Sequence, residues 1–133
     1  MQTYIGVDYH RKCSYMTVMD EKGKIFHEGQ VDNRPEAVRE FLNRAGVNGH
    51  SAAVLEATRN WTVMYDSLEE LVGEVHLAHP LKVKAIAEAK IKTDKIDAKV
   101  LAHLLRCDLL PEAYVPAPAA RRARNILRQR MFF

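Results

Sequence analysis

The chain opens with three short segments whose apolar and polar positions are typical of β-strands. Residues 3–8, "TYIGVD", are nearly all apolar, which favours a strand buried on both faces. Residues 14–20, "SYMTVMD", alternate, and a turn with Gly23 leads to "KIFHEGQV" at residues 24–31. Because the connecting loops are short, the pattern predicts three consecutive antiparallel strands.

Helical and strand-like segments alternate along the rest of the chain. Asn60 is a plausible N-cap for one helix, and Gly73 a plausible stop for it. The segment "KTDKIDAKVLAHLL" from Lys92 has the rhythm of an amphipathic helix. Two further strands are predicted at residues 51–57 and 74–79. Helices are predicted at residues 34–46, 60–73, 81–89 and 92–108.

The resulting order, β-β-β-α-β-α-β-α, predicts an α/β fold. A meander of strands followed by alternating strands and helices forms a mixed five-stranded sheet with flanking helices. The ribonuclease H-like (RuvC-like) fold has this order, and in it the first and fourth strands are neighbours. Fold alone does not give function, so side-chain chemistry must decide it.

Composition narrows the class of protein. The 133 residues suffice for one domain with a core, and no apolar run approaches the ~20 residues of a membrane span. The first residues have no signal-peptide pattern. Cys13 and Cys107 are isolated from each other and from any metal-binding spacing. We therefore expect a cytoplasmic protein with two reduced thiols.

The formal net charge is +3, and the charged residues are distributed unevenly along the chain. Residues 119–133 hold five arginines and no acid, and they follow a proline-rich stretch. We expect a domain over residues 1–110, a stiff linker over residues 111–118 and the start of a basic helix over residues 119–133, which would lead to a further C-terminal region.

Four acids are the candidates for chemistry. Asp8 ends the first predicted strand and Glu56 ends the apolar part of the fourth, so the fold would bring them together. Asp94 and Asp97 lie three residues apart on one predicted helix face, where they repel each other. Carboxylates grouped in this way suit Mg²⁺ or Mn²⁺, and two such ions can promote phosphoryl transfer.

Each acid also has a structural alternative. Asp8 could start a turn, and Glu56 could pair with Arg59. Asp94 stands at the predicted helix start, where it could be the N-cap, and Asp97 one turn further in could favour the positive end of the helix. Convergence of all four on one site is the hypothesis that explains them jointly.

The segments "YIGVDYHRK", "LEAT" and "AKIKTDKIDAKVLAHLL" resemble the amino-terminal RuvC-like DEDD domain of insertion-sequence-110 transposases over about residues 3–130. The resemblance implies divalent-metal-dependent DNA strand cleavage and exchange in transposition, with Asp8, Glu56, Asp94 and Asp97 as catalytic metal ligands. It also implies a structured guide RNA, a homo-oligomer and a serine-bearing C-terminal domain, which nothing in this sequence matches.

Basic residues near and beyond the acids are the candidates for nucleic-acid binding: Lys92, Lys95, Arg121, Arg124 and Arg128. Two other classes of protein share features with this sequence. Sugar-kinase-like ATPases also begin with a strand ending in Asp, but "DYHRKCS" lacks their glycine-rich phosphate loop. A non-catalytic ribonuclease H-fold module for nucleic-acid binding or dimerisation is the alternative that stays open.

Overall fold

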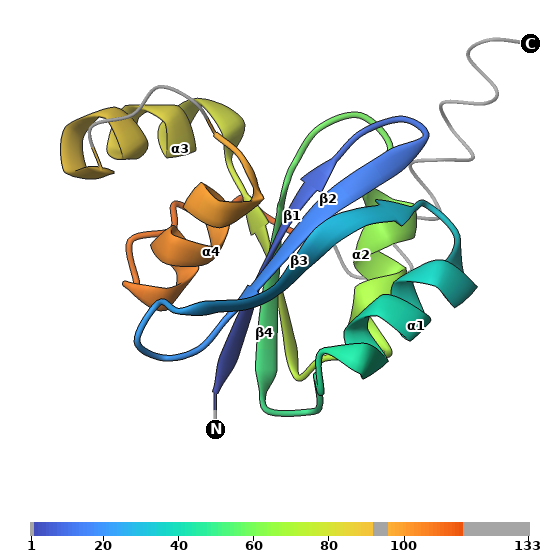
Figure 1. The fold of residues 1–133 in the computed structure, drawn as a ribbon. Helices are drawn as coiled ribbons and strands as arrows, with labels where there is room; N and C mark the ends of the chain where they lie inside the picture. Colours follow the sequence, from blue (N-terminus) through green and yellow to red (C-terminus); the bar gives the residue numbers. More distant parts are fainter. Residues whose placement is uncertain (1, 92–95, 116–133) are drawn as a thin grey trace, which may run out of the picture.

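The computed structural model describes residues 2–91 and 96–115, which form a five-stranded sheet flanked by helices (Figure 1). The strands are β1 (Thr3–Tyr9), β2 (Cys13–Met19), β3 (Ile25–Asp32), β4 (Ser51–Glu56) and β5 (Glu74–Ala78). The helices are α1 (Pro35–Arg44), α2 (Trp61–Glu69), α3 (Pro80–Ile86), a π-helical turn η1 (Ala87–Ile91) and α4 (Ala98–Arg106).

The sheet has the mixed topology that the sequence predicts. Its strand order is β3-β2-β1-β4-β5. The first three strands are antiparallel neighbours, whereas β4 pairs in parallel with both β1 and β5. The first and fourth strands are therefore adjacent at the centre of the sheet, as expected.

Alternate residues of the central strands pack against opposite layers. Ile5, Val7 and Leu55 contribute to a core beneath α1 and α2. Val54 belongs instead to a second core with Leu101 and other residues of α3 and α4. Figure 1 shows α4 on one side of the sheet and α1 with α2 on the other. Each face of the central strands thus has its own helical cover.

Helix α2 begins directly after Asn60, as the sequence predicts, but it ends earlier than predicted. Asn60 does precede α2, but it adopts a left-handed conformation (φ 63°) and its side chain makes no capping hydrogen bond. The helix ends at Glu69, before Gly73. Gly73 serves a different purpose, because a Cβ there would lie 2.0 Å from the carbonyl oxygen of Gly49.

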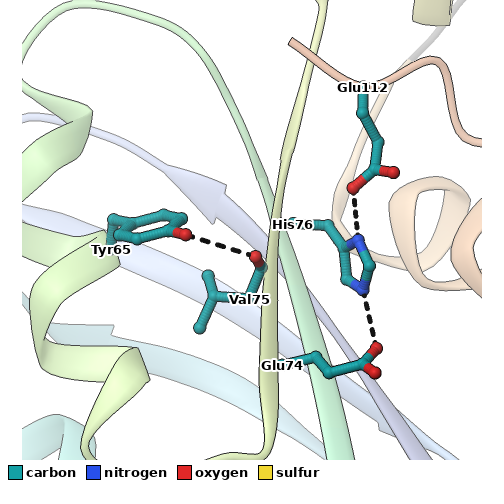
Figure 2. Close-up of polar contacts among 5 residues, drawn as sticks. All are labelled: Tyr65, Glu74, Val75, His76 and Glu112. Carbon is teal, nitrogen blue, oxygen red and sulfur yellow. Dashed lines mark hydrogen bonds and ion pairs between the residues drawn. The ribbon is translucent and has the colours of Figure 1, made fainter. Parts of the chain in front are cut away.

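Residues 111–115 pack on the sheet edge beside β5, where the sequence predicts the beginning of a linker. The Ala113 N–H donates to the Leu77 carbonyl (2.7 Å), and the His79 N–H donates to the Pro111 carbonyl (2.9 Å). Glu112 hydrogen-bonds Nδ1 of His76 (Figure 2). The rest of the proposed linker, residues 116–118, lies outside the described residues, and the division into domains stays a prediction.

Two smaller expectations concern the thiols and the membrane. Cys13 and Cys107 both carry free thiols, the first half-buried and the second exposed. Across residues 2–91 and 96–115, no helix has the length and apolar character needed to cross a bilayer.

Candidate active site

Asp8 and Glu56 end up side by side because β1 and β4 are parallel and in register. Val7 pairs with Leu55, so the next residue along each strand is one of the two acids. Glu56 is also paired with Ala78 in β5. The carboxyl ends of these central strands therefore bring both acids to one edge of the sheet.

The two carboxylates also point to the same face. Gly6 is the register partner of Val54, whose side chain packs in the core under α3 and α4. Side chains alternate along a strand, so residues two positions later lie on the same face. Asp8 and Glu56 hence face the layer that contains α4.

The electrostatics agree with this proximity. Burial raises the pKa of the Glu56 carboxyl, and the negative charge of Asp8 raises it further. Asp8 is about one-third exposed (32%), and its Oδ2 lies 3.1 Å from Nε2 of His10. Two close carboxylates, both partly buried, form a site at which a cation would relieve repulsion.

Helix α4 reaches this edge because β1 has a glycine where the helix crosses it. A Cβ on Gly6 would lie 1.8 Å from the carbonyl oxygen of Ala98 and 2.9 Å from the amide nitrogen of Ala102. No other residue type leaves room for that approach. The backbone of the first turn of α4 is consequently in direct contact with β1, two residues before Asp8.

The direction of α4 places its N-terminus toward the acids. At its other end, Arg106 donates to the Glu21 carbonyl (3.5 Å). Glu21 lies in the turn after Met19, which pairs with Tyr4 near the start of β1. Since α4 ends beside the start of β1, it runs antiparallel to β1 and begins toward the strand's carboxyl end.

Asp97 is the N-cap of α4, which corrects the sequence-based expectation. The helix begins at Ala98 instead of Lys92, and Oδ1 of Asp97 accepts a hydrogen bond from the Val100 N–H (2.9 Å). Sequence reasoning assigned the cap to Asp94 and placed Asp97 one turn inside the helix. Asp94 lies outside the described residues.

The carboxylates suit a hard divalent ion. Among the residues that the structure describes, no three His, Cys, Asp or Glu side chains form a metal-binding group. Mg²⁺ usually keeps several waters and needs only one or two protein carboxylates. The mutually repelling pair Asp8 and Glu56 fits that requirement, and its donors are all oxygen, which favours Mg²⁺ or Mn²⁺ over softer metals.

Comparison with known proteins identifies the family. A transposase family profile of the DEDD insertion-sequence-110 type matches residues 5–132. The chain belongs to this transposase family. A search of curated proteins finds no match.

The solved structure of RuvC supports the fold of this transposase domain. RuvC from T. thermophilus, in complex with a Holliday junction substrate, is similar with a TM-score of 0.53 at 15% identity, covering 85% of this chain and 100% of that one. A polyphosphate/ATP-glucomannokinase from Arthrobacter sp. strain KM has a TM-score of 0.45 at 16% identity, covering 71% and 51% respectively. The transposase domain thus has the RuvC-like, ribonuclease H-like fold.

The remaining predicted site residues of the transposase lie outside the described part: Lys92, Lys95, Arg121, Arg124 and Arg128. Their proposed contact with nucleic acid stays a prediction. The alternative in which Glu56 pairs with Arg59 is not realised within the described residues, where Arg59 is exposed.

The sequence analysis gave no role to Arg11 and considered Arg59 only as an ion-pair partner of Glu56 in the transposase. Arg11 and Arg59 lie three residues after Asp8 and Glu56 respectively, in "DYHR" and "EATR". That shared spacing was visible in the sequence. Whether the two arginines act together depends on how close the loop after β1 lies to the loop after β4, which only the structure shows.

Proposed function

We propose that this transposase domain cleaves and exchanges DNA strands, with Asp8, Glu56, Asp94 and Asp97 holding divalent cations. The observation that carries the proposal is the placement of Asp8 and Glu56 at the adjoining ends of β1 and β4. The N-terminus of α4 packs against the same strand. Membership of the transposase family and a DNA-bound RuvC of the same fold support DNA as the substrate.

The acidic side chains would have different roles in holding the cations. Asp8 and Glu56 present oxygen ligands from the centre of the sheet, and a bound cation would offset the burial and the repulsion by Asp8 that raise the pKa of Glu56. Asp97 has one oxygen committed to the helix cap, which fixes its carboxylate and leaves the other oxygen available. Bound Mg²⁺ or Mn²⁺ would supply activation of the attacking oxygen and charge stabilisation at the leaving oxygen.

Further parts of the proposal rest on the family resemblance. Strand exchange would require a serine-bearing domain in addition to this one, so this chain alone would form no covalent protein–DNA linkage. A structured guide RNA and a homo-oligomer would take part, and the protein would work in the cytoplasm. A gel assay for a covalent adduct with a plasmid carrying the element's ends tests the first of these statements.

Calorimetry of Mn²⁺ binding tests the metal site itself. Asp8→Asn and Glu56→Gln keep the side-chain shapes and each remove one charge, so both should bind Mn²⁺ more weakly than wild type. Asp32→Asn is the matched control, since Asp32 is an exposed strand-end acid beside Arg34. Equal binding by wild type and Asp8→Asn would contradict the proposal and favour a non-catalytic nucleic-acid-binding or dimerisation module.

A further inference from the structure

A polar groove with a volume of about 510 Å³ lies beside the acids, at the same edge of the sheet. It is formed by two loops that are far apart in the sequence, one after β1 and one between β4 and α2. The groove is lined by Tyr9, His10, Arg11, Thr58, Arg59 and Asn60. Its size is within the range of small-ligand sites.

The groove carries positive charge that no carboxylate among the described residues neutralises. Arg11 and Arg59 are both exposed, and within residues 2–91 and 96–115 neither guanidinium has a carboxylate partner. The planar donors of arginine match the oxygens of a phosphate. The groove is thus built to receive an anion with several acceptor oxygens.

Neutral donors and a helix end add to this preference. Asn60 lines the groove immediately before α2, and its side chain makes no capping bond to that helix. The positive end of the α2 dipole is therefore next to the groove. Thr58 places a hydroxyl group on the same wall. All of these features favour an anionic phosphate over an apolar or cationic ligand.

The groove adjoins the Asp8 and Glu56 pair through His10. Tyr9 follows Asp8 in β1 and packs against the core on the α1 and α2 side, so the two side chains leave the strand in opposite directions. His10 joins the two regions, because it lines the groove and contacts Asp8. A nucleic-acid strand that crosses this edge can place one phosphate at the acids and a neighbouring phosphate in the groove.

We propose that the groove between the β1 and β4 loops binds a backbone phosphate of the DNA strand whose neighbouring phosphate lies at Asp8 and Glu56. Arg11 and Arg59 hold that phosphate, with Asn60 and Thr58 as additional donors. The identity of the ligand as DNA rests on the proposed function, whereas the preference for a phosphate rests on the groove alone. Such a contact positions the strand without reading its sequence.

Fluorescence anisotropy of the full chain with labelled oligo(dT), in EDTA and across a salt series, tests the proposal. Arg11→Gln and Arg59→Gln should each weaken binding several-fold at low salt. The slope of log affinity against log salt should fall by about 0.7 for each arginine removed. Arg39→Gln is the matched control, because Arg39 is an exposed arginine of α1, away from the groove, near Glu70 (3.7 Å).

A charge-preserving variant and a melting curve guard against a folding artefact. Arg59→Lys should retain most of the salt slope, and all variants should melt as wild type because both arginines are exposed. If Arg59→Lys lost as much of the salt slope as Arg59→Gln, the charge of this side chain would not contact a phosphate and the proposal would fail. A double Gln variant with the affinity and salt slope of wild type would also overturn it.

Two further measurements distinguish this proposal from RNA binding and from the proposed catalytic function. If Arg11→Gln and Arg59→Gln lost affinity for oligo(rU) but not for oligo(dT), the groove would bind RNA and the DNA assignment would be wrong. Mn²⁺ binding by the double Gln variant should equal that of wild type. If Asp8→Asn bound Mn²⁺ normally while the arginine variants lost DNA affinity, the proposed catalytic function would fail and the phosphate groove would stand.

Discussion

The carbonyl oxygen of Ala98 occupies the space in which a side chain on Gly6 would begin. An ideal Cβ on Gly6 would lie 1.8 Å from that oxygen, far inside van der Waals contact. The contact joins the N-terminus of α4 to the middle of β1, two residues before Asp8. The position of Asp97 relative to the strand-end acids therefore depends on a residue that has no side chain.

Gly6→Ala should destabilise the metal-free protein by about 1–3 kcal/mol, the usual cost of overpacking. It should also weaken Mn²⁺ binding, because α4 must move away from β1. Urea unfolding and calorimetry measure the two effects. Gly29→Ala is the control, since a Cβ there would make an ordinary 3.6 Å contact with Phe41. Equal stability of the two variants would show that α4 does not depend on this close approach.

Substitutions at Asp97 should separate helix capping from metal binding. Asparagine caps helices about as well as aspartate, so Asp97→Asn should melt close to wild type, whereas Asp97→Ala should lose about 1 kcal/mol. Both variants should bind Mn²⁺ more weakly. Melting curves and calorimetry on the pair make the comparison. Normal Mn²⁺ binding by both would leave Asp97 as a cap and remove it from the ligand set.

Glu56→Gln should stabilise the metal-free protein at neutral pH. Burial and the charge of Asp8 raise the pKa of Glu56 above its ordinary value of 4.5, so the unfolded chain releases this proton more readily than the folded protein. Stability is consequently lost as the pH rises above that value, and glutamine avoids the loss. The difference in melting temperature should be near zero below pH 4.5 and positive at pH 7.

Two controls sharpen the Glu56 experiment. Glu28→Gln removes an exposed carboxyl from β3 and should show no comparable trend. Saturating Mn²⁺ should reverse the order, since wild type binds the ion more tightly and gains more stability. A Glu56→Gln variant that melts below wild type at neutral pH without metal would indicate a structural partner for Glu56.

His76 should hold residues 111–115 more firmly at acidic than at alkaline pH. Burial lowers the pKa of His76, but Glu112 and Glu74 outweigh it and raise the pKa above 6.5 (Figure 2). A raised histidine pKa gives stability that is complete below 6.5 and lost as the pH rises through the folded value. The protection factor of the Ala113 amide, which bonds to Leu77, should fall over that range.

Glu112→Gln is the test variant for this contact. It should reduce the protection factor of Ala113 at pH 6 and have less effect at a pH above the raised pKa of His76, where the ring is neutral. A reduction of the same size at both pH values would mean that the charge of His76 contributes nothing to the contact.

The arginine-rich segment should contribute most of the nucleic-acid affinity of the whole chain. Arg121, Arg124 and Arg128 recur at helical spacing, so the sequence predicts that they share one face. A chain ending at Pro118 should bind duplex DNA or structured RNA more weakly and with a shallower salt dependence. Unchanged binding after this truncation would shift the main contact to Arg11 and Arg59 or to the lysines around residues 92–95.

The sequence by itself determined the order of strands and helices and the pairing of the two strand-end acids. Apolar alternation defines strands locally, and the connection lengths leave few topologies. Once β1 and β4 are neighbours, Asp8 and Glu56 must lie at one edge, because each follows the buried part of its strand. This information is contained in short segments of the chain.

The tertiary structure decided how the helices and loops approach that edge. The approach of the N-terminus of α4, with Asp97 as its cap, to β1 depends on the close contact between Ala98 and Gly6, about 90 residues earlier in the chain. The polar groove likewise needs the loops of Arg11 and Arg59 to meet. Neither contact leaves a periodic pattern, because each arises between segments that become neighbours only when the sheet has formed.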